Sequence, residues 1–150
     1  VVLTGSEPIR QNIGPMIFAL LRGGYKVGIE TNGTLFRSNI PWSRIMVVCS
    51  PKTPKIHPDL FPHIDALKYV IEAGHVDPTD GLPSKTLGGL PPAKPPFRGS
   101  PVVGQIPIYI QPMDEQDPEQ NRKHIDTAVE VVTRWNYLLC LQTQKLIGLQ

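Results

Sequence analysis

The feature that most constrains the fold of this chain is the regular pairing of a short apolar run with a polar cluster that follows it directly. The runs have the length and the Val, Ile and Leu content of strands buried in a parallel sheet. The clusters are Thr4-Gly5-Ser6-Glu7, Glu30-Thr31-Asn32-Gly33, Ser50-Pro51-Lys52, Gln111-Pro112-Met113-Asp114 and Gln142-Thr143-Gln144-Lys145. Because ligands bind at the carboxyl ends of parallel strands, we expect the clusters to converge on one site. The pattern therefore favours a binding or catalytic domain over a scaffold.

The composition is that of one globular domain. A chain of 150 residues with 40% hydrophobic and 19% charged residues can bury roughly 70% of its unfolded surface. The formal net charge of +2 is too small, and the basic residues too scattered, to indicate nucleic acid or an anionic membrane as a partner. Cys49 and Cys140 lie in apolar runs, so we expect them to be buried, reduced and structural, which favours a cytoplasmic location. No apolar stretch has the length of a membrane helix, and no signal segment opens the sequence.

The order of the predicted elements is β-α-β-β-β-loop-β-α-β, which is typical of an α/β sheet or partial barrel. Apolar residues at helical spacing predict a helix that contains Pro15 in its first turn and stops at Gly23-Gly24. A second helix is predicted after the N-cap Asp117. Strands are predicted over residues 1–3, 26–30, 45–48, 106–110 and 137–141. Residues 65–72 fit a strand or a helix, and their β-branched and aromatic residues favour a strand. Since Val1-Val2-Leu3 is already the body of a strand, we expect the single domain 1–150 to be incomplete at its amino terminus.

The segment 74–103 is rich in Pro, Gly, Ser and Lys. Prolines at this spacing prevent any regular element from continuing, because each removes a backbone donor and fixes φ. We therefore predict a long mobile loop.

Each polar cluster also has an ordinary structural interpretation. Thr4-Gly5-Ser6-Glu7 can be a tight turn with a helical cap, and Asn32-Gly33 can close a turn. Lys52 and Lys55 can hold an anion or be solvated loop residues. The acidic group Asp114, Glu115 and Asp117 can bind a metal, although Asp117 is better explained as a cap. The four histidines have neither metal-ligand spacing nor a nucleophilic partner, and we assign them no role.

Together the clusters resemble one family, the 7-carboxy-7-deazaguanine synthases (QueE), which are radical S-adenosylmethionine enzymes of the 7-deazapurine (queuosine precursor) pathway. The resemblance runs through the whole chain and weakens only in the proline-rich loop. The pair Ser50-Pro51-Lys52 and Gln111-Pro112-Met113-Asp114 is its most specific part. The other matching segments are Leu3-Thr4-Gly5-Ser6-Glu7-Pro8, Ile29-Glu30-Thr31-Asn32-Gly33-Thr34, Asp65-Ala66-Leu67-Lys68-Tyr69, Leu141-Gln142-Thr143 and Lys145-Leu146-Ile147-Gly148.

The resemblance implies the carboxyl-terminal portion of a truncated radical S-adenosylmethionine barrel, α/β with a mainly parallel sheet and with its amino-terminal strands missing. It implies a lyase that converts 6-carboxy-5,6,7,8-tetrahydropterin to 7-carboxy-7-deazaguanine with loss of ammonia, a 4Fe-4S cluster, Mg²⁺, a reductant such as flavodoxin or ferredoxin, and a homodimer. The implied cofactor-binding residues are Ser6, Ser50, Pro51, Lys52, Gln111, Pro112, Met113 and Asp114. The implied substrate contacts are Thr4, Gln144 and the terminal Gln150. No catalytic residue is identified, and no metal ligand is expected in this chain.

The sequence departs from the family pattern in three ways. A 4Fe-4S cluster needs three nearby Cys thiolates, and this chain has two distant cysteines. Ser6 stands where the family has a second Gly, so that a Cβ would penalise a positive φ. Gln144 stands where the family usually has His and cannot exchange a proton. An inactive fragment of the enzyme is therefore one interpretation, and a non-catalytic binding or interaction protein that kept the fold is the alternative. A lyase or isomerase on a complete barrel is a distant third.

Overall fold

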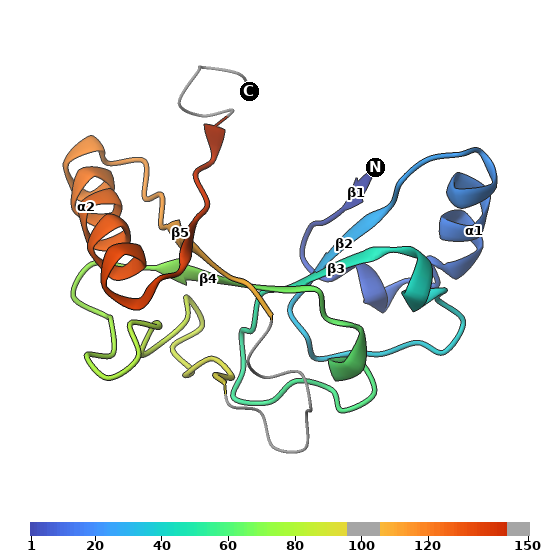
Figure 1. Cartoon of the computed structure of the whole chain (residues 1–150), viewed down its shortest axis with the longest axis horizontal. Coiled ribbons are helices and arrows are strands. Elements are labelled where there is room, and N and C mark those ends of the chain that lie inside the picture. Colours follow the sequence, from blue (N-terminus) through green and yellow to red (C-terminus); the bar gives the residue numbers. More distant parts are fainter. Residues whose placement is uncertain (96–105, 144–150) are drawn as a thin grey trace.

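The computed structural model describes residues 1–95 and 106–143, and its central element is a six-stranded sheet in which every neighbouring pair of strands is parallel. The strands lie in the order in which they occur in the sequence, as expected for part of a barrel (Figure 1). They are β1 (Val2–Leu3), β2 (Gly28–Thr31), β3 (Met46–Cys49), β4 (Ala66–Ile71), β5 (Ile108–Pro112) and β6 (Leu138–Leu139).

Two α-helices complete the predicted element order. Helix α1 (Gly14–Arg22) connects β1 to β2, carries Pro15 in its first turn and ends at Gly23. Helix α2 (Pro118–Trp135) connects β5 to β6, and the Asp117 carboxylate accepts hydrogen bonds from the backbone N–H groups of Glu119 and Gln120. In the described residues of the other crossovers, the only helical elements are the 3₁₀ turns η2 (Trp42–Arg44) and η3 (Phe61–His63). A further turn, η1 (Pro8–Arg10), precedes α1.

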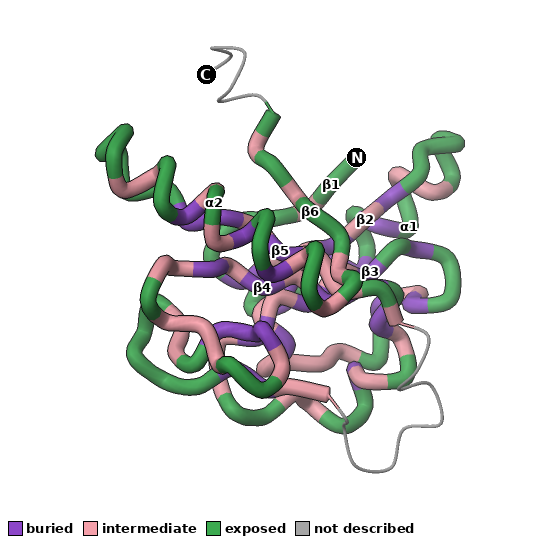
Figure 2. Tube along the Cα trace, turned by 60° about the vertical axis from the view of Figure 1, so that its left-hand side comes forward, coloured by how far each residue is buried: buried purple, intermediate pink, exposed green. Residues whose placement is uncertain are grey.

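The core lies on one face of the sheet, because alternate side chains of a strand point to opposite faces. Ile29, Val47, Leu67, Tyr69 and Ile110 form this core with residues of both helices. Buried residues follow the central strands, whereas both edge strands are largely exposed (Figure 2). The opposite face carries side chains of intermediate burial, among them Glu30, Lys68 and Gln111.

The strand boundaries differ from those predicted where the ladder continues into the polar clusters. Thr31 pairs with Cys49 at the ends of β2 and β3, and Ile71 pairs with Pro112 at the ends of β4 and β5. Pro112 is tolerated because it is the last residue of its strand. The prediction for Cys140 was wrong: it follows the two-residue β6 and is half-exposed. Cys49 is fully buried, as expected.

The loop predicted over 74–103 contains no helix or strand in its described part, 74–95, and residues 96–103 lie outside the described residues. The described part is fastened to the body of the protein. Leu82 belongs to the core, and the Tyr69 hydroxyl donates to the Ala93 carbonyl at 2.7 Å. Within the segment itself, Lys94 pairs with Asp77 and Asp80. Mobility of the loop stays a prediction. Within the described ranges, no helix is long and apolar enough to cross a membrane.

Candidate functional site

The site lies at the carboxyl edge of the sheet, where the ends of β1, β2, β3, β4 and β5 surround a cavity of about 230 Å³. We call this the central cavity. It is lined by Thr4, Gly5, Ser6, Glu30, Thr31, Asn32, Ser50, Lys52, Lys68, Val70 and Gln111. The parallel arrangement of the strands brings these residues together from positions far apart in the sequence. The expected convergence of the clusters is therefore present in the structure.

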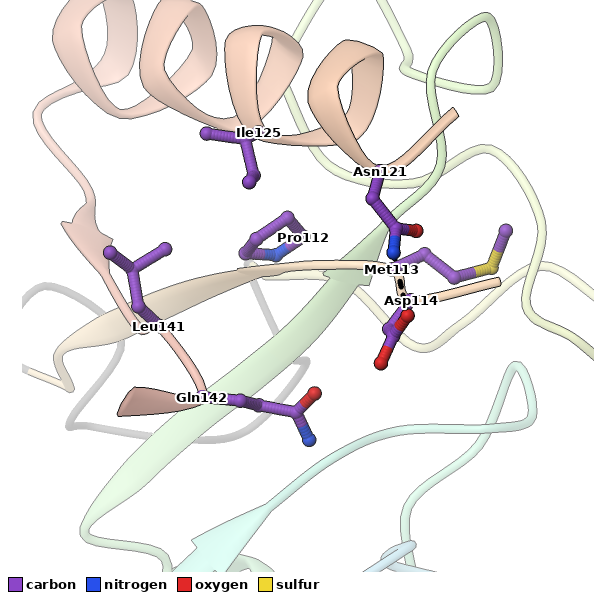
Figure 3. A pocket seen from close by; sticks show the side chains of 7 residues that line it. All are labelled: Pro112, Met113, Asp114, Asn121, Ile125, Leu141 and Gln142. Carbon is purple, nitrogen blue, oxygen red and sulfur yellow. Dashed lines mark hydrogen bonds between the residues drawn. The ribbon is translucent and has the colours of Figure 1, made fainter. Parts of the chain in front are cut away.

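Two further cavities lie near the central one: the first shares Lys52 and Val70 with it, and the second shares Met113 with the first. The first is narrow, about 20 Å³, and is bounded in part by Pro51, Lys52 and Met113. The second, about 230 Å³, lies between the end of β5, the segment after β6 and the first turns of α2, and we call it the α2 cavity. Its walls are Pro112, Met113, Asp114, Asn121, Ile125, Leu141 and Gln142 (Figure 3).

Each site residue that the sequence predicted, and that the structure describes, lines one of these cavities. Thr4, Ser6, Ser50, Lys52 and Gln111 line the central cavity, Pro51 the narrow one, and Pro112, Met113 and Asp114 the α2 cavity. Gln144 and Gln150 lie outside the described residues. The structure thus brings the predicted set together, and the roles assigned to its members stay predictions.

Lys52 gives the central cavity its positive character. Among the described residues, no carboxylate or other group pairs with the Lys52 ammonium in a hydrogen bond or ion pair. Burial, and then the nearby Lys68 ammonium, lower its pKa from 10.5. Both effects disfavour the charged form of Lys52. An anionic group of a ligand would therefore stabilise the charged form of Lys52.

Sequence reasoning assigned no role to an ion pair that crosses the open face of the sheet. The Lys68 Nζ lies 2.7 Å from Glu30 Oε2, and the same oxygen accepts a hydrogen bond from the Thr4 hydroxyl at 3.3 Å. Both charged residues line the central cavity. The sequence signal that could have indicated this pair is Lys68, a charged residue within the otherwise apolar strand β4. Only the sheet register shows that Lys68 and Glu30 meet.

The Thr4-Gly5-Ser6-Glu7 turn is held by the buried Glu7 carboxylate. Its Oε1 accepts from Ile9 N at 3.1 Å, its Oε2 accepts from Asn32 N at 2.7 Å, and the Thr31 hydroxyl lies 3.0 Å from both oxygens. Glu7 therefore caps the 3₁₀ turn η1, as the structural interpretation predicted, and also joins the ends of β1 and β2. These bonds hold the turn that carries Thr4 and Ser6 into the lining of the central cavity.

The backbone strain expected at Ser6 does not occur. Among the described non-glycine residues, only Gln116 and Asn136 have a positive φ, and in this turn the positive φ belongs to Gly5, at 133°. A serine is therefore compatible with the backbone at position 6. Ser6 lines the central cavity and brings a hydrogen-bonding side chain to it.

The comparisons with known proteins agree with the resemblance seen in the sequence. The chain is 44% identical to a 7-carboxy-7-deazaguanine synthase of Rhodospirillum rubrum over 98% of its length, and 36% identical to one of Rickettsia prowazekii over 100%. The chain is a homologue of the 7-carboxy-7-deazaguanine synthases. It spans 63% and 59% of the length of these two relatives. No family model matches the chain.

The fold agrees with that of a solved structure, QueE from Escherichia coli. The superposition has a TM-score of 0.62 at 22% sequence identity and covers 95% of this chain and 56% of the other. The predicted α/β fold with a parallel sheet is thus confirmed, and the coverage is consistent with a partial fold. At this identity the likeness concerns the fold alone.

Proposed function

We propose that this chain forms the S-adenosylmethionine-binding wall of a 7-carboxy-7-deazaguanine synthase of the radical S-adenosylmethionine superfamily. The observation that carries the proposal is that the predicted cofactor residues, which come from three strand ends, line three neighbouring cavities at the carboxyl edge of the sheet. The Lys52 ammonium, which has no ion-pair partner among the described residues, is one of them. Because the chain spans less than two thirds of the length of its named relatives, the activity of a whole synthase is part of the proposal.

The residues present fit S-adenosylmethionine, which carries a carboxylate, an ammonium, ribose hydroxyls and an adenine ring. Lys52 binds the carboxylate, and Asp114 binds the ammonium or a ribose hydroxyl. The apolar walls Pro112, Ile125 and Leu141 of the α2 cavity suit the faces of a planar ring (Figure 3). When bound and reduced, the cofactor supplies the hydrogen-abstracting radical for converting 6-carboxy-5,6,7,8-tetrahydropterin to 7-carboxy-7-deazaguanine with loss of ammonia.

The residues do not fit a 4Fe-4S cluster. Cys49 is fully buried, and burial together with Glu7 raises the pKa of its thiol to about 12, so that it stays protonated. Cys140 follows β6, whereas Cys49 ends β3, so that β4 and β5 lie between the two strands. Among the described residues, no cluster of His, Cys, Asp or Glu could hold a metal ion. The cluster and Mg²⁺ would need ligands outside this chain, and we derive no step through them.

On the substrate side, we propose that Thr4, Glu30 and Lys68 contact the pterin. The ion pair offers a carboxylate acceptor and an ammonium donor within the central cavity, which suits the mixed donors and acceptors of a pterin ring. Gln144 and Gln150 are proposed substrate contacts from the family pattern alone. A reductant such as flavodoxin or ferredoxin, a homodimer and a cytoplasmic location belong to the same proposal.

A non-catalytic binding protein is the second candidate, and Gln144 favours it, because it stands where the family usually has His and cannot exchange a proton. In that case the cavities would bind a ligand without converting it.

The proposal is tested by joining this chain to the amino-terminal region of the Rhodospirillum rubrum relative and assaying the product anaerobically. We expect 7-carboxy-7-deazaguanine and 5′-deoxyadenosine, both measured by mass spectrometry. Lys52→Met should raise KM for the cofactor about 10- to 100-fold, the effect of losing a charge-assisted hydrogen bond. Lys55→Met, at an exposed neighbouring position, is the matched control and should have little effect. A joined protein that holds a cluster but never cleaves the cofactor would support the non-catalytic candidate.

A further inference from the structure

One side chain of α2 holds the turn that follows β5. The Asn121 Nδ2 donates to Asp114 Oδ1 at 2.7 Å, and the Asn121 Oδ1 accepts from the Glu115 N–H at 2.9 Å (Figure 3 shows the first bond). Both ends of the amide are therefore used within one turn of chain. A side chain with an acceptor in place of the Nδ2 donor, or a donor in place of the Oδ1 acceptor, cannot make both hydrogen bonds.

The turn itself is strained at the residue after Glu115. Gln116 has a φ of 62°, in the left-handed region that glutamine seldom adopts. Its N–H donates to the same Asp114 Oδ1, at 3.0 Å. Such backbone strain persists only where the surroundings impose it. Among the described residues, Asn121 Nδ2 and the Gln116 N–H thus donate to the same oxygen of Asp114, which lines the α2 cavity.

The contacts of Asn121 are separate from those that form and dock the helix. Asp117 caps the first turn of α2, and the buried residues of the helix are His124, Ala128 and Val131. Asn121 itself is half-exposed and lines the cavity. Its bonds therefore serve the Asp114–Glu115 turn and not the helix core.

We propose that Asn121 is a positioning residue that holds the Asp114 carboxylate in the orientation that receives the adenosyl cofactor. This proposal rests on the proposed function, because it assigns the α2 cavity to S-adenosylmethionine. In Asn121→Asp, an oxygen replaces the Nδ2 donor and faces the Asp114 carboxylate, so attraction becomes repulsion. The Asp114 carboxylate then loses the hydrogen bond from Nδ2 that joins the strained turn to α2.

The test measures the binding of S-adenosylhomocysteine to the 150-residue chain by calorimetry. Asn121→Asp should raise the dissociation constant at least tenfold while the thermal unfolding midpoint stays close to that of the control. The control is Gln120→Glu, the same change from amide to acid at the neighbouring residue of the helix, and it should bind within twofold of the unaltered chain. A purely structural role would lower the unfolding midpoint together with the affinity.

The outcomes separate the two proposals. If the unaltered chain binds and Asn121→Asp binds equally well, the positioning role is overturned and the proposed function stands. If the unaltered chain shows no saturable binding, the proposed function is overturned, and the positioning role with it. Should Asn121→Asp fail to fold, Asn121→Ser, which introduces no charge and has one hydroxyl in place of two amide ends, is judged by the same tenfold criterion.

Discussion

Replacing Glu7 by Gln should destabilise the fold far more than an amide-for-carboxylate change usually does. The Glu7 side chain is buried, and each of its oxygens accepts a bond from a different backbone N–H group: Oε1 from Ile9 and Oε2 from Asn32. Gln must place its NH₂ group at one of the two positions. In either orientation a donor then faces a donor, so one backbone N–H is left without an acceptor.

The magnitude follows from these contacts. A buried N–H that loses its partner costs about 1 to 3 kcal/mol, and the remaining bonds weaken because the acceptor is no longer charged. The sum is about 2 to 4 kcal/mol, which for a domain of this size lowers the unfolding midpoint by roughly 5 to 15 °C.

Urea and thermal unfolding followed by circular dichroism measure this difference. Glu130→Gln, on an exposed position of α2, is the matched control and should change the free energy of unfolding by less than about 0.5 kcal/mol. If Glu7→Gln is as stable as this control, the carboxylate does not hold the ends of β1 and β2 as described.

Three further outcomes are expected. His124→Ala should cost about 2 to 4 kcal/mol in urea unfolding, because the buried His124 ring is lost and the Ala73 N–H loses the Nδ1 acceptor at 2.9 Å. Iodoacetamide should label Cys140 before the buried Cys49 in the folded protein. The Cys49 pKa is raised from 9.0 to about 12, so the protonated thiol contributes its full stabilisation below pH 9 and loses it as the pH rises toward 12. Cys49→Ala should therefore flatten the alkaline decline in the free energy of unfolding. Limited proteolysis should cut first within 74–103, and first cuts in α2 would contradict the predicted loop.

Much of the fold could be predicted because the local signals agree with the global arrangement. Pro15, Gly23 and Asp117 stand at helix ends that the structure confirms. The apolar runs predicted parallel strands, and parallel strands place their carboxyl ends at one edge. That geometric rule is sufficient to bring Ser6, Lys52 and Gln111 to one cavity.

The remaining features depend on contacts that no local pattern encodes. The Glu30–Lys68 pair forms across β3 and requires the strand register. The bonds of Asn121 depend on a strained turn at Gln116, a residue with no local preference for that conformation. Cys140 was misplaced because its apolar neighbours continue beyond the two paired residues of β6.

The most direct test of the account is a titration of the ¹⁵N-labelled chain with S-adenosylmethionine, followed by amide chemical shifts. We expect saturable changes at Ser6, Lys52 and Gln111, which line the central cavity, and at Asp114, which lines the α2 cavity. In Lys52→Met, the ligand concentration needed for half-saturation of these changes should rise about 10- to 100-fold. The absence of saturable changes, or changes centred on the stacked rings of Phe36 and His57 instead, would contradict the claim that the carboxyl edge of this sheet binds the cofactor.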